Sequence, residues 1–422
     1  MPFIKISNKS GKLYLGVILI FLFSASTLLA RTLFVGPNHN VKNLKNTIQI
    51  ARDGDTILLD GGYYNEGNLI IDKNICLIGK NLPVLDGAFK YEILTISGDH
   101  IAISGIKFIN CGASAMNDFA SIKCIDATNI LLSNNVIIDS YFGIHVSNSS
   151  NIKIVDNIIV GSPKTEQNCG NGIHLWKCNH IIINDNQVRG HRDGIYLEFV
   201  TESMIQNNFS SKNIRYGLHF MFSHKNAYIC NTFKDNGAGV AVMYSHEVQM
   251  EQNTFENNWG ASAYGILLKD ISDSKIYGNF FIKNTVGIYM EGSSRIIVMK
   301  NLFKENGWAL KVQASCDGNS FLNNNFFGNS FDVSTNGTMT LNTFSENYWD
   351  KYEGYDLAKD GFGDIPYHPV NLFSMIVEQN PSTLILLRSI LISFLDKAEK
   401  AIPSLTPENL FDKKPLLFPN IL

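Results

Sequence analysis

The sequence predicts an all-β fold: a right-handed parallel β-helix (solenoid) with a C-terminal α-helical extension. The first observation is a tetrapeptide, Gly-aliphatic-x-apolar, that recurs between residues 143 and 312. Successive copies are separated by 29, 22, 23, 22, 26, 22 and 22 residues, and the last copy has Ala309 in place of Gly. A fixed period of this size, with one short strand per repeat, marks a solenoid. Parallel crossovers favour the right-handed form.

The second observation is two columns of apolar residues in one register. Because alternate residues of a strand share a face, both columns are expected to fill the core. The first column is Ile144, Ile173, Ile195, Leu218, Val240, Ile266, Ile288 and Leu310. The second is Val146, Leu175, Leu197, Phe220, Val242, Leu268, Met290 and Val312.

The third observation is an asparagine that returns with the same period, which suits a tight turn because Asn tolerates left-handed conformations. Stacked on successive coils, these residues predict an Asn ladder. Its expected members are Asn135, Asn157, Asn186, Asn207, Asn231, Asn253, Asn279, Asn301 and Asn342.

The chain divides into five predicted segments. Residues 1–30 have the layout of a secretory signal peptide, with lysines before an apolar run and cleavage after Ala30; Leu28 is large for its place, so an uncleaved anchor is the alternative. Residues 31–54 form an N-terminal cap with a short amphipathic helix within 41–52, and the β-helix spans 55–347. A loop-rich region, 348–381, and an amphipathic helix with a tail, 382–422, complete the chain.

Composition excludes some classes of function. The net charge of −3 carries no basic footprint for nucleic acid. Seven cysteines form an odd number without CxxC spacing, so most are interpreted as buried or incidental thiols. In the loop-rich region, Asp356, Asp360 and Asp364 match the spacing of a calcium loop only in part, and a structural turn is favoured.

The C-terminal helix is predicted over 382–400, with one apolar stripe. It is too short to span a bilayer and is interrupted by Arg388. It either packs on the end of the solenoid or docks, peripherally, on a membrane surface or membrane partner. The stripe is Leu384, Leu387, Leu391, Phe394 and Ala398.

A candidate metal site comes from a duplicated Met-aromatic-Ser-His sequence at 221–224 and 243–246, one coil apart. Stacking at ~4.8 Å would bring Met221 onto Met243 and His224 onto His246, with His219 nearby. Thioether and imidazole together suit Cu(I) better than a hard cation. The alternative is a surface stripe that a partner covers.

The outward-facing residues of the same strands suggest an alternative, enzymatic function. His174, Tyr196 and His219, flanked by Arg192, Asp193 and Arg215, could serve a polysaccharide lyase or epimerase as acid, base and charge neutraliser. Against this function, the column turns apolar at Ala241 and Leu267, and outward carboxylates for paired-acid hydrolysis do not gather there.

Several stretches are distinctive beyond the repeat: Arg215–Ser223, Asn258–Gly265, Asn306–Val312, Gly328–Val333, Asn347–Asp350 and the tail Leu372–Pro381. These stretches, and the tail most specifically, resemble the NosD family of periplasmic nitrous oxide reductase maturation proteins. The resemblance covers essentially the whole mature chain. The Gly-Ile-x-x repeat is shared by β-helix proteins in general, so the tail and the Trp-containing loop carry most of the resemblance.

The resemblance implies a non-enzymatic periplasmic role. Proteins of this family work with the membrane and ATPase subunits of an ABC transporter and with a copper-chaperone lipoprotein. Together they build the copper–sulfur site of nitrous oxide reductase, and the family is often described as copper-binding. No set of family ligands is carried over, so the Met/His cluster rests on the repeat alone.

Overall fold

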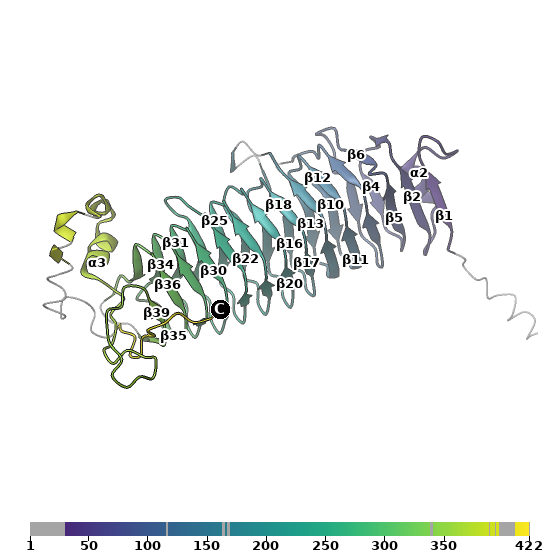
Figure 1. The fold of residues 1–422 in the computed structure, drawn as a ribbon. Coiled ribbons are helices and arrows are strands. Elements are labelled where there is room, and N and C mark those ends of the chain that lie inside the picture. The colour runs from purple at the N-terminus through teal and green to yellow at the C-terminus, as the bar shows by residue number, and fades with distance from the viewer. Residues whose placement is uncertain are drawn as a thin grey trace, which may run out of the picture.

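The computed structural model describes residues 30–114, 117–162, 165–166, 169–337, 341–387, 389–392, 394–395 and 410–421. The chain winds as a parallel β-solenoid, with one strand of each of three sheets in most coils (Figure 1). Sheets A, B and C contain 14, 13 and 12 strands, so almost every coil adds one strand to each sheet. The predicted β-helix is confirmed. The predicted signal peptide, apart from Ala30, lies outside the described residues.

The strands are short, because each side of a coil is only a few residues long. Sheet A consists of β1 Thr32–Val35, β2 Thr56–Asp60, β5 Cys76–Lys80, β8 Ala102–Ser104, β11 Thr128–Ser133, β14 Ser150–Val155, β17 Ile182–Asn184, β20 Met204–Gln206, β23 Ala227–Ile229, β26 Gln249–Glu251, β29 Lys275–Tyr277, β32 Ile297–Met299, β35 Asp317–Leu322 and β38 Leu341–Ser345. Sheet B consists of β3 Tyr63–Tyr64, β6 Val84–Asp86, β9 Lys107–Ile109, β12 Val136–Ile138, β15 Ile158–Val160, β18 Gln187–Arg189, β21 Phe209–Ser211, β24 Thr232–Lys234, β27 Thr254–Glu256, β30 Phe280–Ile282, β33 Leu302–Lys304, β36 Asn325–Phe327 and β39 Tyr348–Trp349. Sheet C consists of β4 Leu69–Ile71, β7 Leu94–Ile96, β10 Ala120–Ile125, β13 Phe142–Ser147, β16 Ile173–Trp176, β19 Ile195–Glu198, β22 Tyr216–Met221, β25 Ala238–Met243, β28 Tyr264–Lys269, β31 Val286–Glu291, β34 Trp308–Val312 and β37 Phe331–Ser334.

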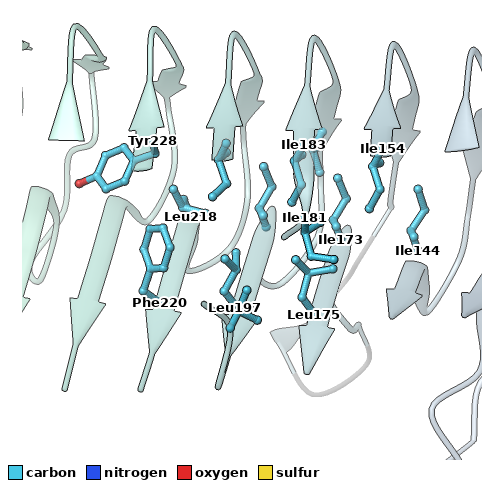
Figure 2. Packing of buried hydrophobic residues seen from close by; sticks show 14 of the residues in the cluster. Ile144, Ile154, Ile173, Leu175, Ile181, Ile183, Leu197, Leu218, Phe220 and Tyr228 are labelled. Atoms are coloured by element: carbon cyan, nitrogen blue, oxygen red, sulfur yellow. The ribbon is translucent and has the colours of Figure 1, made fainter. Parts of the chain in front are cut away.

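The register stacks equivalent residues of successive coils. In sheet C, Leu218 pairs with Val240 and Phe220 with Val242. All four side chains are fully buried, and Figure 2 shows Leu218 and Phe220 in the interior between the strands. Full burial of such a side chain contributes ~1.5–3 kcal/mol. Both predicted apolar columns are therefore the core of the solenoid.

The turn after sheet A carries the predicted Asn ladder, with two corrections. In each rung the Oδ1 atom accepts hydrogen bonds from the residue one coil earlier: Asn279 accepts from the backbone N of Asn253 at 2.8 Å and from its Nδ2 at 3.0 Å. Asn207 is not a member, because it is the exposed, left-handed turn residue (φ 54°) beside the true rung, Asn208. Asn342 belongs to a separate ladder, in which it accepts from Asn319.

A second stack, of aromatic rings, lines the interior along sheet B. The rings of Phe255, Phe281 and Phe303 follow one another at centroid distances of 4.8 Å, with planes 7° and 5° apart. The in-register parallel stacking of identical side chains produces this arrangement. Trp349 closes the stack against Phe326 at 4.1 Å.

The N-terminal end is closed by the helix α2, Leu44–Ile50, which falls within the predicted 41–52 helix. Leu44 and Ile48 are buried against the first coils. The side chain of Lys73 donates to the carbonyls at the C-terminal end of α2, which favours a cation there. Strand β1 precedes this helix and pairs with β2, so the sheet begins before the predicted start at residue 55.

The C-terminal region differs from the prediction in where its helices lie. Helix α3, Leu372–Gln379, begins in the segment predicted to be loop-rich; Asn371 caps it, with Oδ1 2.7 Å from the backbone N of Ser374. Within the predicted 382–400 helix, the 3-10 segment η2 spans Pro381–Leu386, and residues 390–392 and 394–395 are helical. Residues 388, 393 and 396–400 of the predicted helix, including Ala398, lie outside the described residues.

Helix α3 lies against the end of sheet C. The carboxylate of Glu378 contacts Lys311 at 2.8 Å and accepts a hydrogen bond from Ser334 at 3.1 Å. Phe373 is buried with its ring centroid 5.8 Å from that of Phe331. The helix therefore covers apolar surface that the last strands of sheet C would otherwise expose.

The final described residues, 410–421, return to the same end of the solenoid. Asp412 is fully buried and accepts from the backbone N and Nδ2 of Asn347, at 3.0 and 2.9 Å, and from Trp349 Nε1 at 3.1 Å. It thus takes the place of the next rung of the Asn ladder. The tail is part of the C-terminal cap, which blocks the open edge of the last coil.

Candidate functional site

The candidate metal residues follow from the alternation of strand β22 and of its neighbour β25. Since Leu218 and Phe220 point inward, His219 and Met221 lie on the outer face of sheet C. Met221 pairs with Met243 in the parallel ladder, and both side chains are half-buried. The two thioethers therefore occupy equivalent positions on adjacent coils, at the ends of their strands.

The two predicted histidines lie around the corner from the methionines. The rings of His224 and His246 are stacked, with centroids 4.0 Å apart and planes 15° apart. Nδ1 of His224 is buried without a hydrogen-bond partner, whereas Nδ1 of His246 lies 3.0 Å from Oε1 of Glu247. Burial lowers the pKa of His224, with a smaller effect from the neighbouring His246. A neutral His224 has a ring nitrogen free to bind a metal.

The two methionines lie side by side on adjacent coils, and so do the two histidines. A turn separates the methionine pair from the histidine pair. Phe222 and Tyr244 stand between methionine and histidine with φ of 49° and 51°. Their rings stack at 5.0 Å, and Phe222 also stacks on Phe199 at 5.3 Å. This exposed aromatic row was not predicted as part of the site. Its sequence signal was the aromatic residue inside the duplicated Met-aromatic-Ser-His.

His219 belongs to a different group of side chains. It is 3% exposed, and its ring packs on Tyr196 at 4.9 Å and on Tyr216 at 4.8 Å. Nδ1 lies 3.5 Å from Oδ2 of the fully buried Asp193, and neither ring nitrogen has a hydrogen-bond partner. The contacts of His219 thus lie with the outward column of rings on sheet C rather than with His224 and His246.

The residues of the alternative enzymatic function also lie in that column. The rings of His145, His174, Tyr196 and His219 follow one another at centroid distances of 4.9 Å each. Burial lowers the pKa of His174 to about 3, so its ring is neutral at physiological pH. Of the flanking charges, Arg215 lies 3.7 Å from Asp193, and Nε of Arg192 is buried without a partner.

This column is packed rather than open. His219 and Asp193 are nearly or fully removed from solvent, and the Tyr196 hydroxyl donates to Glu198 at 3.3 Å. His174 and Tyr196 are half-buried, whereas a sugar could reach His219 only if the rings of Tyr196 and Tyr216 that pack on it moved. The geometry therefore does not favour a polysaccharide enzyme.

A groove lies on another face of the solenoid. It has a volume of about 1090 Å³ and follows the outer side of sheet A, where Lys225 and Glu247 line it. These residues directly follow His224 and His246 in sequence, so the stacked rings lie next to its rim. Within the described ranges, no group of three or more His, Cys, Asp and Glu side chains is arranged to hold a metal ion. A site here would need the thioethers or an outside ligand.

The three aspartates of the C-terminal loop bind their own backbone. The carboxylate of Asp356 accepts from the backbone N of Asp360 at 3.2 Å and of Gly361 at 2.9 Å. Asp360 and Asp364 accept from other amides of the same loop. These bonds are those of a structural turn, as the sequence favoured.

The family model described as "Periplasmic copper-binding protein (NosD)" matches residues 94–213 and 155–354. The chain belongs to the NosD family. Two curated relatives, each named "Probable ABC transporter binding protein NosD", are similar over most of both chains. The protein from Pseudomonas aeruginosa is 26% identical over 392 residues, with 86% of this chain and 88% of the relative covered. That from Stutzerimonas stutzeri is 28% identical over 407 residues, with 91% and 92% covered.

Solved structures similar to this NosD-family chain support the fold alone. PfbA, a surface adhesin of Streptococcus pneumoniae, has a TM-score of 0.56 at 12% identity, with 72% of this chain and 87% of that chain covered. The catalytic unit of an α-1,3-glucanase from Streptomyces thermodiastaticus has a TM-score of 0.57 at 13% identity, with 72% and 65% covered. An adhesin and a hydrolase share the architecture, so function must be argued from the site. In the part of the chain that the structure describes, no helix is long and apolar enough to cross a membrane.

Proposed function

We propose that this NosD-family protein is a non-enzymatic periplasmic maturation factor that handles copper during assembly of the copper–sulfur site of nitrous oxide reductase. It works with the membrane and ATPase subunits of an ABC transporter and with a copper-chaperone lipoprotein. The family description and the names of the two relatives support the copper and transporter parts of this proposal.

The observation that carries copper handling is the double pairing of soft donors on two adjacent coils. Met221 is in register with Met243, and His224 is stacked on His246. Thioethers and neutral imidazoles favour Cu(I) over hard cations. The half-buried position of the donors suits an ion that is received and passed on. His219 would lie at the inner margin of this surface.

The C-terminal region supports peripheral docking on the transporter. The predicted apolar stripe is divided: Leu384 and Leu387 pack against the buried cluster that includes Phe373, whereas Leu391 and Phe394 are 53% and 66% exposed. Exposed apolar side chains on adjacent turns of a soluble protein usually mark an interaction site. Docking on the membrane subunit would bury this half of the stripe.

The test of copper handling is an anaerobic competition titration with a Cu(I) chelator. The double variant Met221→Leu/Met243→Leu removes the sulfur donors while roughly preserving volume. The expected result is an affinity loss of at least about tenfold, equal to ~1.4 kcal/mol. The matched control is Met204→Leu/Met299→Leu, which changes two half-buried outward methionines of sheet A. Equal affinity in the wild type and both variants would eliminate the Met/His surface as the copper site.

A further inference from the structure

A second group of soft donors lines a small cavity at the turn between sheets B and C. The cavity has a volume of about 230 Å³, and its lining includes Cys111, Cys169 and His191. Cys111 follows strand β9, Cys169 lies in the loop after β15, and His191 follows β18. The three side chains are 4%, 5% and 0% exposed. Residues from several coils thus bring two buried thiols and a buried imidazole to one small cavity.

His191 occupies a turn position at which the following coils carry asparagine. Asn213 accepts from the backbone N of His191 at 3.1 Å, and Asn236 accepts from that of Asn213 at 3.0 Å. This second Asn ladder continues through Asn258, Asn284, Asn306 and Asn329. Each of these amides is satisfied by its neighbours. His191 heads the ladder with a side chain that cannot make the same bonds.

Both ring nitrogens of His191 are buried without a hydrogen-bond partner. Leaving a buried polar group unpaired costs ~1–3 kcal/mol. An asparagine at this position would avoid that cost, so stability does not explain the histidine. Violations of a local rule concentrate at functional sites.

The two thiols are held loosely. Their contacts are weak: Cys111 Sγ lies 3.6 Å from the carbonyl of Tyr91, and Cys169 Sγ lies 3.6 Å from that of Glu166. Burial raises the pKa of both thiols, that of Cys111 to about 12, so both are protonated in the absence of a cation. A bound metal would replace the proton, because metal ligands must be deprotonated.

We propose that this cavity is a second soft-metal site, in which the thiolate of Cys169 and the imidazole of His191 hold one Cu(I) ion, with Cys111 lining the same space. On binding, the S–H bond of Cys169 breaks, a sulfur–copper bond forms and the proton passes to solvent; copper stays Cu(I), and no oxidant or reductant is needed. The inference rests on the proposed copper function and deepens it by adding a buried storage position to the half-buried Met/His surface.

One thiolate and one imidazole favour Cu(I) over zinc. A structural zinc site takes four protein ligands, and the described residues contain no group of three or more His, Cys, Asp and Glu arranged for a metal. Cu(I) accepts a thiolate and an imidazole as its only two donors, and soft sulfur ligands select it. Cys169 and His191 are 5% and 0% exposed, so an ion held between them would be largely shielded from solvent.

The experiment uses the full mature chain in the Met221→Leu/Met243→Leu background, so that the Met/His surface cannot contribute. Cu(I) is supplied anaerobically as its bicinchoninate complex. Cys169→Ser and His191→Asn should each weaken the remaining Cu(I) binding at least about tenfold. His191→Asn places the ladder residue in its own register and should stay folded. The control is Cys178→Ser, a buried thiol at a turn position where Ser223 and Ser245 stand in later coils.

A second measurement requires no variant of the cavity. Alkylation of the Met221→Leu/Met243→Leu protein under partly denaturing conditions, read by mass spectrometry, should show Cys169 protected by Cu(I) and Cys178 unprotected. Equal binding by Cys169→Ser and Cys178→Ser, or no protection of Cys169, would overturn the cavity site. Neither result would bear on the Met/His surface, which the titration of the methionine variant tests separately.

Discussion

The imidazole rings of His224 and His246 stack face to face at 4.0 Å, one coil apart on the same corner of the solenoid. In the neighbouring coils, small polar residues occupy this corner: Thr201 before the pair and Ser272 after it, where Ser272 forms a bridge with His246. Two adjacent coils thus carry histidine at a corner where the coils on either side carry a small polar residue. This arrangement places two ligand-type nitrogens side by side at the rim of the sheet A groove.

The histidine pair gives the first prediction. His224→Thr/His246→Ser restores the residues of the neighbouring coils, so the fold should be preserved while Cu(I) affinity falls at least about tenfold. The measurement is the same chelator competition, with thermal melting as the check on folding. His180→Asn, which changes an exposed histidine paired with Glu202 at 3.1 Å, is the control. Unchanged affinity in the double variant would show that the stack is structural.

The second prediction concerns stability and pH. Burial lowers the pKa of His174 to about 3 and of His191 to about 4, whereas an unfolded histidine titrates near ~6.5. Between these values the unfolded chain binds more protons than the folded one, so the free energy of unfolding rises with pH. We expect the contribution of these two rings to be complete above pH ~6.5 and to be lost progressively from there down to about pH 3.

Thermal melting across this pH range measures the effect. His191→Asn should flatten the dependence, because it removes one titrating group. A slope identical in the wild type and His191→Asn would contradict the assignment of acid sensitivity to buried rings.

The third prediction separates the true ladder from the neighbouring asparagines. Asn253 is fully buried, and its amide donates to Asn279 and to the carbonyl of Tyr228. Asn253→Ala should therefore destabilise the solenoid by ~1–3 kcal/mol, because it leaves buried partners unpaired. Asn207→Ala, at an exposed position outside the ladder, should cost less. The midpoint of urea unfolding is the measurement, and equal losses would refute the ladder's role.

The fourth prediction concerns docking. Leu391→Ser/Phe394→Ser should abolish co-purification with the transporter while leaving the melting temperature unchanged, because both side chains are exposed. Leu384→Ser is the contrasting variant; it should lower the melting temperature, since Leu384 packs against the buried cluster at the end of sheet C. Full co-purification of the double variant would place docking elsewhere on the solenoid.

Deletion of residues 382–422 is a less discriminating test of docking than these point variants. That segment contains Asp412, whose buried carboxylate completes the Asn ladder at Asn347 and accepts from Trp349. Removing it would expose the apolar end of the last coil to water and take away the buried acceptor of Asn347 and Trp349. We therefore expect the deletion to lower stability as well as docking.

The sequence by itself determined the fold, because a repeated pattern overdetermines the register. Every coil repeats the same pattern of inward-facing residues, so Ile195 and Leu197 could be assigned to the core from the repeat alone. The same repeat predicted that Met221 lies beside Met243. An isolated strand would not have given this certainty, since a slip of one residue reverses its faces.

Tertiary structure decided what the repeat does not encode. The corner between Met221 and His224 depends on a left-handed residue at Phe222, so one predicted cluster became two pairs across a turn. Asp412 binds Asn347 at the end of the ladder, although the two residues are about sixty-five positions apart in sequence. No local sequence pattern predicts this contact. The cavity around His191 likewise assembles side chains from separate coils. Long-range contacts of this kind depend on how loops fold back on the solenoid. Side-chain packing determines that arrangement, and the sequence repeat does not encode it.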